Sequence, residues 1–203
     1  VYYATGTHPM SAAEEPLASV DQLIKISKHP KMVGIGETGL DYHYTAESAE
    51  IQKKSLIIHI EAARETGLPL IIHSRAADDD MGKILKSEFK KGKYKCVMHC
   101  FSSSEKLARL SLDLGFYLSM SGIVTFKKSE ELRNIFKIAP IDQVLIETDS
   151  PYLSPDPYRG KRNEPSYTAH TAEVGASIYE IDYQTFAAKT TENFNRLFSK
   201  AVI

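Results

Sequence analysis

The chain has 203 residues, of which 42% are hydrophobic, 9% are aromatic and 25% are charged. This composition excludes a disordered or collagen-like protein and fits one globular domain with a substantial core. The 25 Lys and Arg residues nearly balance 26 Asp and Glu residues, so net charge gives no sign of nonspecific binding to nucleic acid or membrane. Cys96 and Cys100 are too few for a disulfide framework and predict thiols of a reducing compartment. No apolar run approaches the ~18 residues that cross a bilayer, and we expect a soluble cytoplasmic protein without membrane contacts.

Short apolar runs alternate along the chain with segments of helical periodicity. The runs have the length and the β-branched or aromatic content of buried strands. The expected strands are residues 1–5, 32–35, 70–72, 94–98, 116–120 and 144–146.

Helix signals lie between these runs. Two pairs have the spacing of a capping box: Ser19 with Gln22, and Ser102 with Glu105. The segment 47–66 ends at Gly67, a residue typical of helix C-termini. A helix beginning after Ser129 must end before Pro140.

Strand and helix alternate six times, which predicts parallel strands joined by crossover helices. Two α/β architectures fit this pattern: an open doubly wound sheet and a (β/α)8 barrel. The first strand is followed by Gly6-Thr7-His8-Pro9, which is not a glycine-rich phosphate turn. The residues at the other strand ends favour the barrel.

Titratable side chains follow five of the six expected strands: His8, Glu37, His73, His99 and Asp149. The carboxyl ends of parallel strands open on one face, so these side chains should converge on one pocket. Imidazole nitrogen and carboxylate oxygen together suit a metal of intermediate softness. We therefore predict that Glu37, His73, His99 and Asp149 bind metal.

Neighbouring residues have predicted supporting roles. Glu147 lies two residues before Asp149, on the same side of the strand, so one of the two can bind metal while the other orients it. Asp41 is expected to hold Arg75 or a loop amide, or simply to form a turn. Three glycines around Glu37 are expected to let metal and substrate approach the backbone: Gly34, Gly36 and Gly39. His29 and His59 are interpreted as structural residues.

Cations surround the expected mouth of the site. They occupy the loops after several strands: Arg75, Lys127, Lys128, Arg159, Lys161 and Arg162. Guanidinium and ammonium groups there suit an anionic substrate that carries phosphate.

Eight segments of the chain resemble those of one family, the TatD metal-dependent deoxyribonucleases. The segments are GTHP, VGIGETGLDY, LPLIIHSR, VMHCFS, SGIVTF, VLIETDSPYL, NEPSYTAHTAEV and TTENFNRLF, and the resemblance covers residues 1–198. It implies a TIM-type (β/α)8 barrel and an enzyme that removes nucleotides from DNA with one or two divalent metal ions, Mg²⁺, Zn²⁺ or Mn²⁺.

The resemblance also implies roles for single residues. Glu37 resembles a carboxylate shared between two metals, and Asp149 resembles a ligand that also handles the attacking water, so these two are the predicted catalytic residues. His73 and His99 resemble imidazole ligands of one metal. His8 and Arg75 resemble residues lining the substrate pocket, where Lys127 and Arg159 are also expected to bind substrate.

One departure from the family concerns the amino end. The family's first strand ends in a His-x-His pair, and no two histidines here are two residues apart. The resemblance begins at the family's third strand, so we expect a single incomplete barrel over residues 1–203, with about six parallel strands, helices outside, and a gap between the first and last strands. The start at Val1 favours truncation, and the other interpretation is a natural short form repaired by homo-oligomerisation or left inactive.

The leading functional hypothesis is therefore a metal-dependent hydrolase of DNA phosphodiester bonds, exonucleolytic and using metal-activated water. An amidohydrolase or lactonase acting on small molecules is the second hypothesis, although the resemblance of Glu37 to the shared carboxylate favours the first. A catalytically silent form that acts as a binding module is the third. A form extended by the missing strands is expected to be the more active one.

Overall fold

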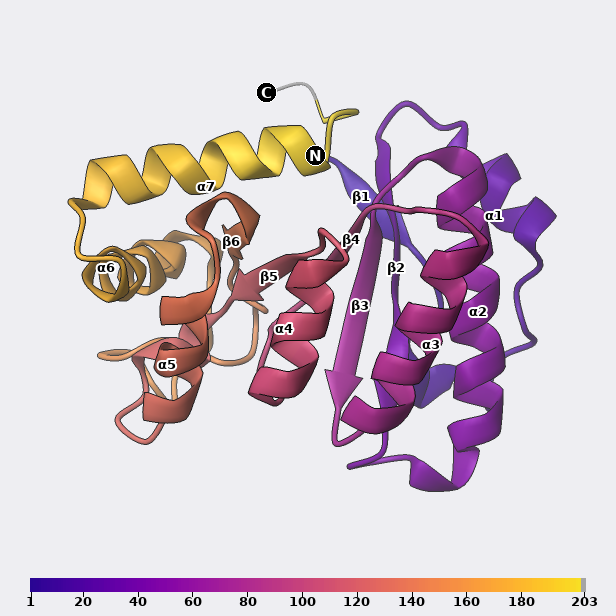
Figure 1. Cartoon of the computed structure of the whole chain (residues 1–203), viewed down its shortest axis with the longest axis horizontal. Helices are drawn as coiled ribbons and strands as arrows, with labels where there is room; N and C mark the ends of the chain where they lie inside the picture. The colour runs from indigo at the N-terminus through magenta and orange to yellow at the C-terminus, as the bar shows by residue number, and fades with distance from the viewer. Residues whose placement is uncertain (202–203) are drawn as a thin grey trace.

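Six parallel strands form one sheet in the computed structural model, which describes residues 1–201 (Figure 1). Each strand pairs with the strand before it along the chain, in the order β1-β2-β3-β4-β5-β6. The strands are β1 (Tyr3–Thr5), β2 (Met32–Asp41), β3 (Leu70–Arg75), β4 (Cys96–Met98), β5 (Tyr117–Met120) and β6 (Val144–Ile146). Strands β1 and β6 are the edges of the sheet and do not pair with each other. The predicted open barrel wall, with its gap between the first and last strands, is therefore confirmed.

Helices connect the strands and cover the sheet (Figure 1). The α-helices are α1 (Val20–Ser27), α2 (Ala49–Thr66), α3 (Asp78–Lys91), α4 (Glu105–Asp113), α5 (Glu130–Ile138), α6 (Thr168–Ile178) and α7 (Tyr183–Leu197). Short 3-10 helices are η1 (Pro9–Ser11), η2 (Ala46–Ser48), η3 (Gly122–Thr125), η4 (Ile141–Gln143) and η5 (Pro165–Tyr167). Helices α1, α2 and α3 lie on one flank in Figure 1, and α7 runs from α6 back toward β1. Within residues 1–201, none of the helices is both long enough and apolar enough to pass through a bilayer.

Local sequence signals explain some of the helix ends. The capping box at Ser19 is confirmed, because its hydroxyl accepts from the backbone N–H of Gln22 while the Gln22 side chain accepts from the Ser19 N–H. Gly67 ends α2 with φ 69°, a conformation that favours glycine. The capping box predicted at Ser102 is wrong, because α4 begins after Ser104 and the Ser104 hydroxyl takes the capping bond.

Side chains alternate between two faces of the sheet. The outer face packs under the helices in the main core, to which β3, β4 and β5 contribute Leu70, Cys96 and Leu118. A second cluster lies on the inner face, where residues from four strands pack against the end of the chain: Val33, Val97, Tyr117, Leu145, Leu197, Phe198 and Ala201. Alternation continues along β3 and past β4, so His73 and His99 point to this inner side.

Strand β2 is longer than predicted, because it continues from Ile35 through Glu37 to Asp41. Gly36 and Gly39 have φ 131° and 151°, and a Cβ atom on Gly36 would lie only 2.5 Å from the carbonyl oxygen of Ile71 in β3. The glycines therefore allow close approach of the neighbouring strand, and the expectation that they let metal and substrate approach the backbone stays a prediction. The pairing register shifts between Ile35 and Thr38, at the position of Glu37.

Candidate metal centre

The four predicted metal ligands lie together at the carboxyl ends of the strands. Glu37 and His73 belong to β2 and β3, whereas His99 directly follows β4 and Asp149 lies in the loop after β6. Oxygen Oε1 of Glu37 is 3.1 Å from Nδ1 of His73 and 3.6 Å from Nε2 of His99. Nε2 of His99 is in turn 3.5 Å from Oδ1 of Asp149. Residues far apart in sequence thus form one continuous cluster.

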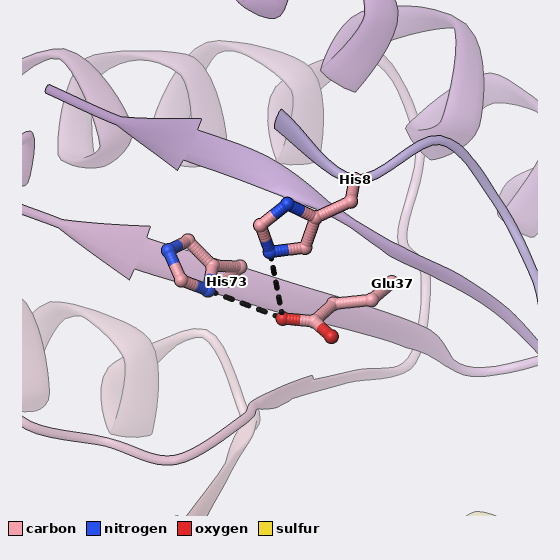
Figure 2. A group of neighbouring side chains, drawn as sticks. All are labelled: His8, Glu37 and His73. Atoms are coloured by element: carbon pink, nitrogen blue, oxygen red, sulfur yellow. Dashed lines mark hydrogen bonds and ion pairs between the residues drawn. The ribbon is translucent and has the colours of Figure 1, made fainter. Parts of the chain in front are cut away.

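Glu37 is the centre of this cluster. Its Oε1 also lies 3.5 Å from Nε2 of His8, so three imidazoles approach a single carboxylate oxygen (Figure 2 shows His8 and His73). Burial raises the pKa of Glu37, but hydrogen bonds from His73 and His8 and the charge of His99 outweigh it and hold the pKa well below its usual range. The carboxylate is therefore negatively charged at neutral pH.

His73 is oriented from both sides of its ring. Its Nδ1 faces Glu37, and its Nε2 lies 3.0 Å from Oδ2 of Asp41. The other oxygen of Asp41 accepts hydrogen bonds from the backbone N–H groups of His43 and Tyr44. The prediction that Asp41 holds a loop amide is confirmed, and Arg75 instead stacks over the Tyr44 ring at 4.6 Å.

His99 has carboxylates on both nitrogens. Nδ1 lies 2.9 Å from Oε2 of Glu147, while Nε2 faces Asp149 and Glu37. Burial lowers the pKa of His99, but the hydrogen bonds with Asp149 and Glu147 raise it to about 11. Glu147 and Asp149 thus hold opposite sides of one imidazole.

The donors in this cluster fit a divalent cation. His8, Glu37 and His73 each offer one ligand atom, and these atoms lie within 4.8 Å of one another. Imidazole nitrogens with a charged carboxylate suit Zn²⁺ or Mn²⁺, and a cation would relieve the excess of carboxylates around His99. His8 was predicted to contact substrate, but its position beside Glu37 makes it a candidate metal ligand as well.

The predicted substrate-binding cations lie in different settings. Arg75 and Lys128 line a cavity of about 990 Å³ beside the first turns of α3 and α5. Lys127 is exposed on the loop before α5, and the guanidinium of Arg159 covers the ring of Phe126 at 4.2 Å. A second cavity, of about 650 Å³, opens on the inner face of the sheet and reaches His99 and Glu147.

Two supporting residues were missed in the sequence. His59 was interpreted as a structural residue, packed or half exposed; it is packed and fully buried, and its Nε2 accepts from the backbone N–H of Thr7, the residue before His8. Asn163 was not singled out, although it lies in the NEPSYTAH segment and contacts both sides of the Asp149 loop. Both contacts join segments distant in sequence, which local patterns do not reveal.

Comparison with known proteins identifies the family. The sequence model of the TatD related DNase family matches residues 1–199. The chain belongs to this family. A metal-dependent hydrolase of Bacillus subtilis, YabD, is 45% identical over 201 residues, which is 98% of this chain and 77% of YabD. YcfH, a metal-dependent hydrolase of Escherichia coli, is 42% identical over 98% of this chain and 74% of its own length.

A solved structure has the same fold. The TatD homologue YJJV of Escherichia coli superimposes with a TM-score of 0.88 at 28% identity, covering 98% of this chain and 76% of YJJV. The six-stranded sheet is thus an α/β arrangement of the TIM-barrel type. The chain is a metal-dependent hydrolase of the TatD family, which agrees with the donor chemistry around Glu37.

Proposed function

We propose that the chain hydrolyses DNA phosphodiester bonds with the help of one or two divalent metal ions. The observation that carries the proposal is the convergence of three imidazoles on one charged carboxylate oxygen, Oε1 of Glu37. The description of the family as TatD related DNases names the substrate class. The cations around the cluster suit the phosphate groups of such a substrate.

Each residue of the site has a role in this proposal. His8, Glu37, His73, His99 and Asp149 are the groups that would hold metal. A bound divalent cation supplies positive charge that stabilises a reacting phosphate and acidifies water. The Asp149 carboxylate, which is 29% exposed, would accept the proton of the attacking water. Arg75, Lys127 and Arg159 bind the phosphates of the DNA backbone.

Release of nucleotides from an end-labelled oligonucleotide tests this proposal. We expect cleavage with Mg²⁺, Mn²⁺ or Zn²⁺, and loss of cleavage with EDTA or after Glu37→Gln, which keeps the size of the side chain and removes its charge. The assay includes the 203-residue chain and a form extended at its amino end. Cleavage that persists in EDTA and in the Glu37→Gln variant would rule out the metal mechanism.

Two other results would replace the proposal. A metal-loaded form that leaves DNA intact but opens a lactone or cyclic amide would assign the site to small-molecule hydrolysis. A purified chain that contains no metal in elemental analysis, and takes up none in titration, would favour a binding module without catalysis.

A further inference from the structure

Asp149 lies in an unusual segment of backbone. It has φ 56°, in the left-handed region that favours glycine. It lies three residues after Ile146, the last residue of β6. The Asp149 carbonyl oxygen accepts a hydrogen bond from the backbone N–H of Tyr152 at 2.8 Å. Backbone in this region persists only where surrounding contacts hold it, so other groups must fix the direction of the Asp149 carboxylate.

Asn163 supplies those contacts. Its Nδ2 donates to the carbonyl oxygen of Thr148 at 2.6 Å and to that of Tyr152 at 2.7 Å, so one amide joins both sides of the Asp149 turn. Its backbone N–H donates to the carbonyl oxygen of Pro151 at 3.0 Å. Its Oδ1 accepts from the backbone N–H of Glu164, and the residue is only 3% exposed.

We propose that Asn163 is a positioning residue that holds the carboxylate of Asp149 toward His99 and so maintains the metal centre. Both side-chain protons of Asn163 are donated to the two carbonyls, so replacing the amide removes two hydrogen bonds that join the two sides of the turn. Without them the turn relaxes out of the left-handed region, and the 3.5 Å contact between Asp149 and His99 opens. This inference rests on the proposed role of Asp149 as a metal ligand, but it does not depend on DNA being the substrate.

The chain contains a matched control for a purely structural role. Asn193 in α7 also uses one Nδ2 to bind two backbone carbonyls, those of Ile141 at 2.7 Å and Val144 at 2.8 Å. It is fully buried, and it holds the start of β6 rather than its end. Loss of either amide should lower stability, but only loss of the Asn163 amide should affect the metal centre.

The test compares Asn163→Asp with Asn193→Asp, since each exchange keeps the shape of the side chain and removes the two donors. Asn163→Ala removes the same donors without adding a charge. Melting temperature gives stability, and calorimetric titration with Mn²⁺ gives metal affinity in the absence of substrate. We expect all three variants to melt at lower temperature. Only the Asn163 variants should bind Mn²⁺ more weakly, by about 10–100-fold, as for other residues that orient metal ligands.

A double-mutant cycle then asks whether Asn163 acts through Asp149. In an Asp149→Asn background, Asn163→Ala should weaken Mn²⁺ binding by less than twofold, because the ligand that it positions is already gone. Additive losses, or equal losses of Mn²⁺ affinity in the Asn163 and Asn193 variants, would overturn the proposal. Absence of Mn²⁺ binding by the parent chain would overturn it too. A parent chain that binds Mn²⁺ but does not cleave DNA removes the proposed substrate and leaves the positioning role to be judged by the affinities alone.

Discussion

The two inner histidines of the cluster are held in opposite ways. His73 lies within β3, where its backbone is paired with β2 at Gly39, and its ring is fixed by Asp41. His99 lies just beyond β4, and its ring is fixed by Glu147 and Asp149, which follow β6. We call His73 and Asp41 the strand side of the metal centre. We call His99, Glu147 and Asp149, with the loop that carries Asp149, the loop side.

The strand side is part of a buried polar network. The Asp41 side chain is 1% exposed and also accepts from two backbone N–H groups. The fully buried Gln52 of α2 continues the network, because it accepts from the Asp41 N–H and donates to carbonyls of Asp41 and Thr45. Removing any of these groups leaves buried partners unsatisfied, so metal binding and folding depend on the same residues here.

The loop side has less support from the sheet. Strands β4 and β6 have three residues each, and Cys100 and Asp149 both have positive φ values of 44° and 56°. Backbone N–H groups of His99 and Glu147 still bond to β3 and β5, but the turn beyond Glu147 is bonded by the Asn163 side chain. The comparison teaches that a change to the loop-side ligand Asp149 should separate activity from stability, whereas changes on the strand side should affect both.

The largest effect on activity is expected on the loop side. Asp149→Asn should lower kcat/KM for an oligonucleotide by about 10²–10⁴-fold, because an amide binds metal weakly and does not accept a proton from water. The melting temperature should stay within the error of the parent value. Asp156→Asn, in the same loop region, is the control and should retain activity. A large fall in melting temperature for Asp149→Asn would contradict the separation of activity from stability.

The strand side should show a combined loss. Asp41→Ala should lower the free energy of unfolding by about 3 kcal/mol, since it leaves His73 and two backbone N–H groups without their hydrogen-bond acceptor. It should weaken metal binding as well. Glu147→Ala is the comparison on the loop side, where the carboxylate is 18% exposed and pairs with His99. It should lower the free energy of unfolding by about 1 kcal/mol. Urea unfolding followed by circular dichroism measures both, and equal losses would abolish the distinction between the sides.

A pH effect should appear on the strand side through His59. Burial lowers the pKa of this imidazole below its ordinary 6.5, although the hydrogen bond to Ser55 opposes the shift. The unfolded chain therefore binds a proton as pH falls through about 6.5 while the folded chain does not, so stability falls with pH in that window. His59→Gln should reduce this fall between pH 7 and pH 5. His29→Gln, at an exposed position, should leave the slope unchanged, and an unchanged slope in both variants would show that His59 does not contribute.

The smallest effect is expected at the exposed rim of the site. Lys127→Ala should weaken DNA binding by less than about 1 kcal/mol and reduce the slope of log affinity against log salt by about 1, as for loss of one phosphate contact. Fluorescence anisotropy with the Asp149→Asn form, which should not cleave, measures both quantities across KCl concentrations. Lys86→Ala, on α3, is the matched control and should change neither. Equal changes in the two variants would show that Lys127 is no part of the substrate path.

The sequence predicts the fold well wherever the signal is local. The six strands and the helix end at Gly67 follow from apolar runs and from one glycine whose φ is positive. Boundaries fail where tertiary contact extends an element, as in β2, which continues past Ile35 because its glycines allow β3 to pair closely. The cap at Ser102 fails because Ser104, two residues later, offers the same hydroxyl at the position where the helix begins.

The candidate site divides in the same way. The convergence of Glu37, His73, His99 and Asp149 is predictable, because parallel strands bring their carboxyl ends to one face. The bonds of Asn163 to Thr148 and Tyr152, and of His59 to Thr7, are not predictable, since nothing in the chain marks which distant carbonyl or N–H a buried polar side chain will meet. Metal identity and substrate depend on the whole geometry and leave no separate signal in the residues.

The consecutive order of the strands has a consequence for synthesis on the ribosome. Because each strand pairs with the one translated just before it, the sheet can grow at its newest edge while the chain is still being made. His8, Glu37 and His73 come together once β3 has emerged, long before Asp149 and the Asn163 amide are translated. A nascent chain of this length thus contains His8, Glu37 and His73 of the metal centre but not Asp149. The metal ligands can act together only after Asp149 and Asn163 have also emerged.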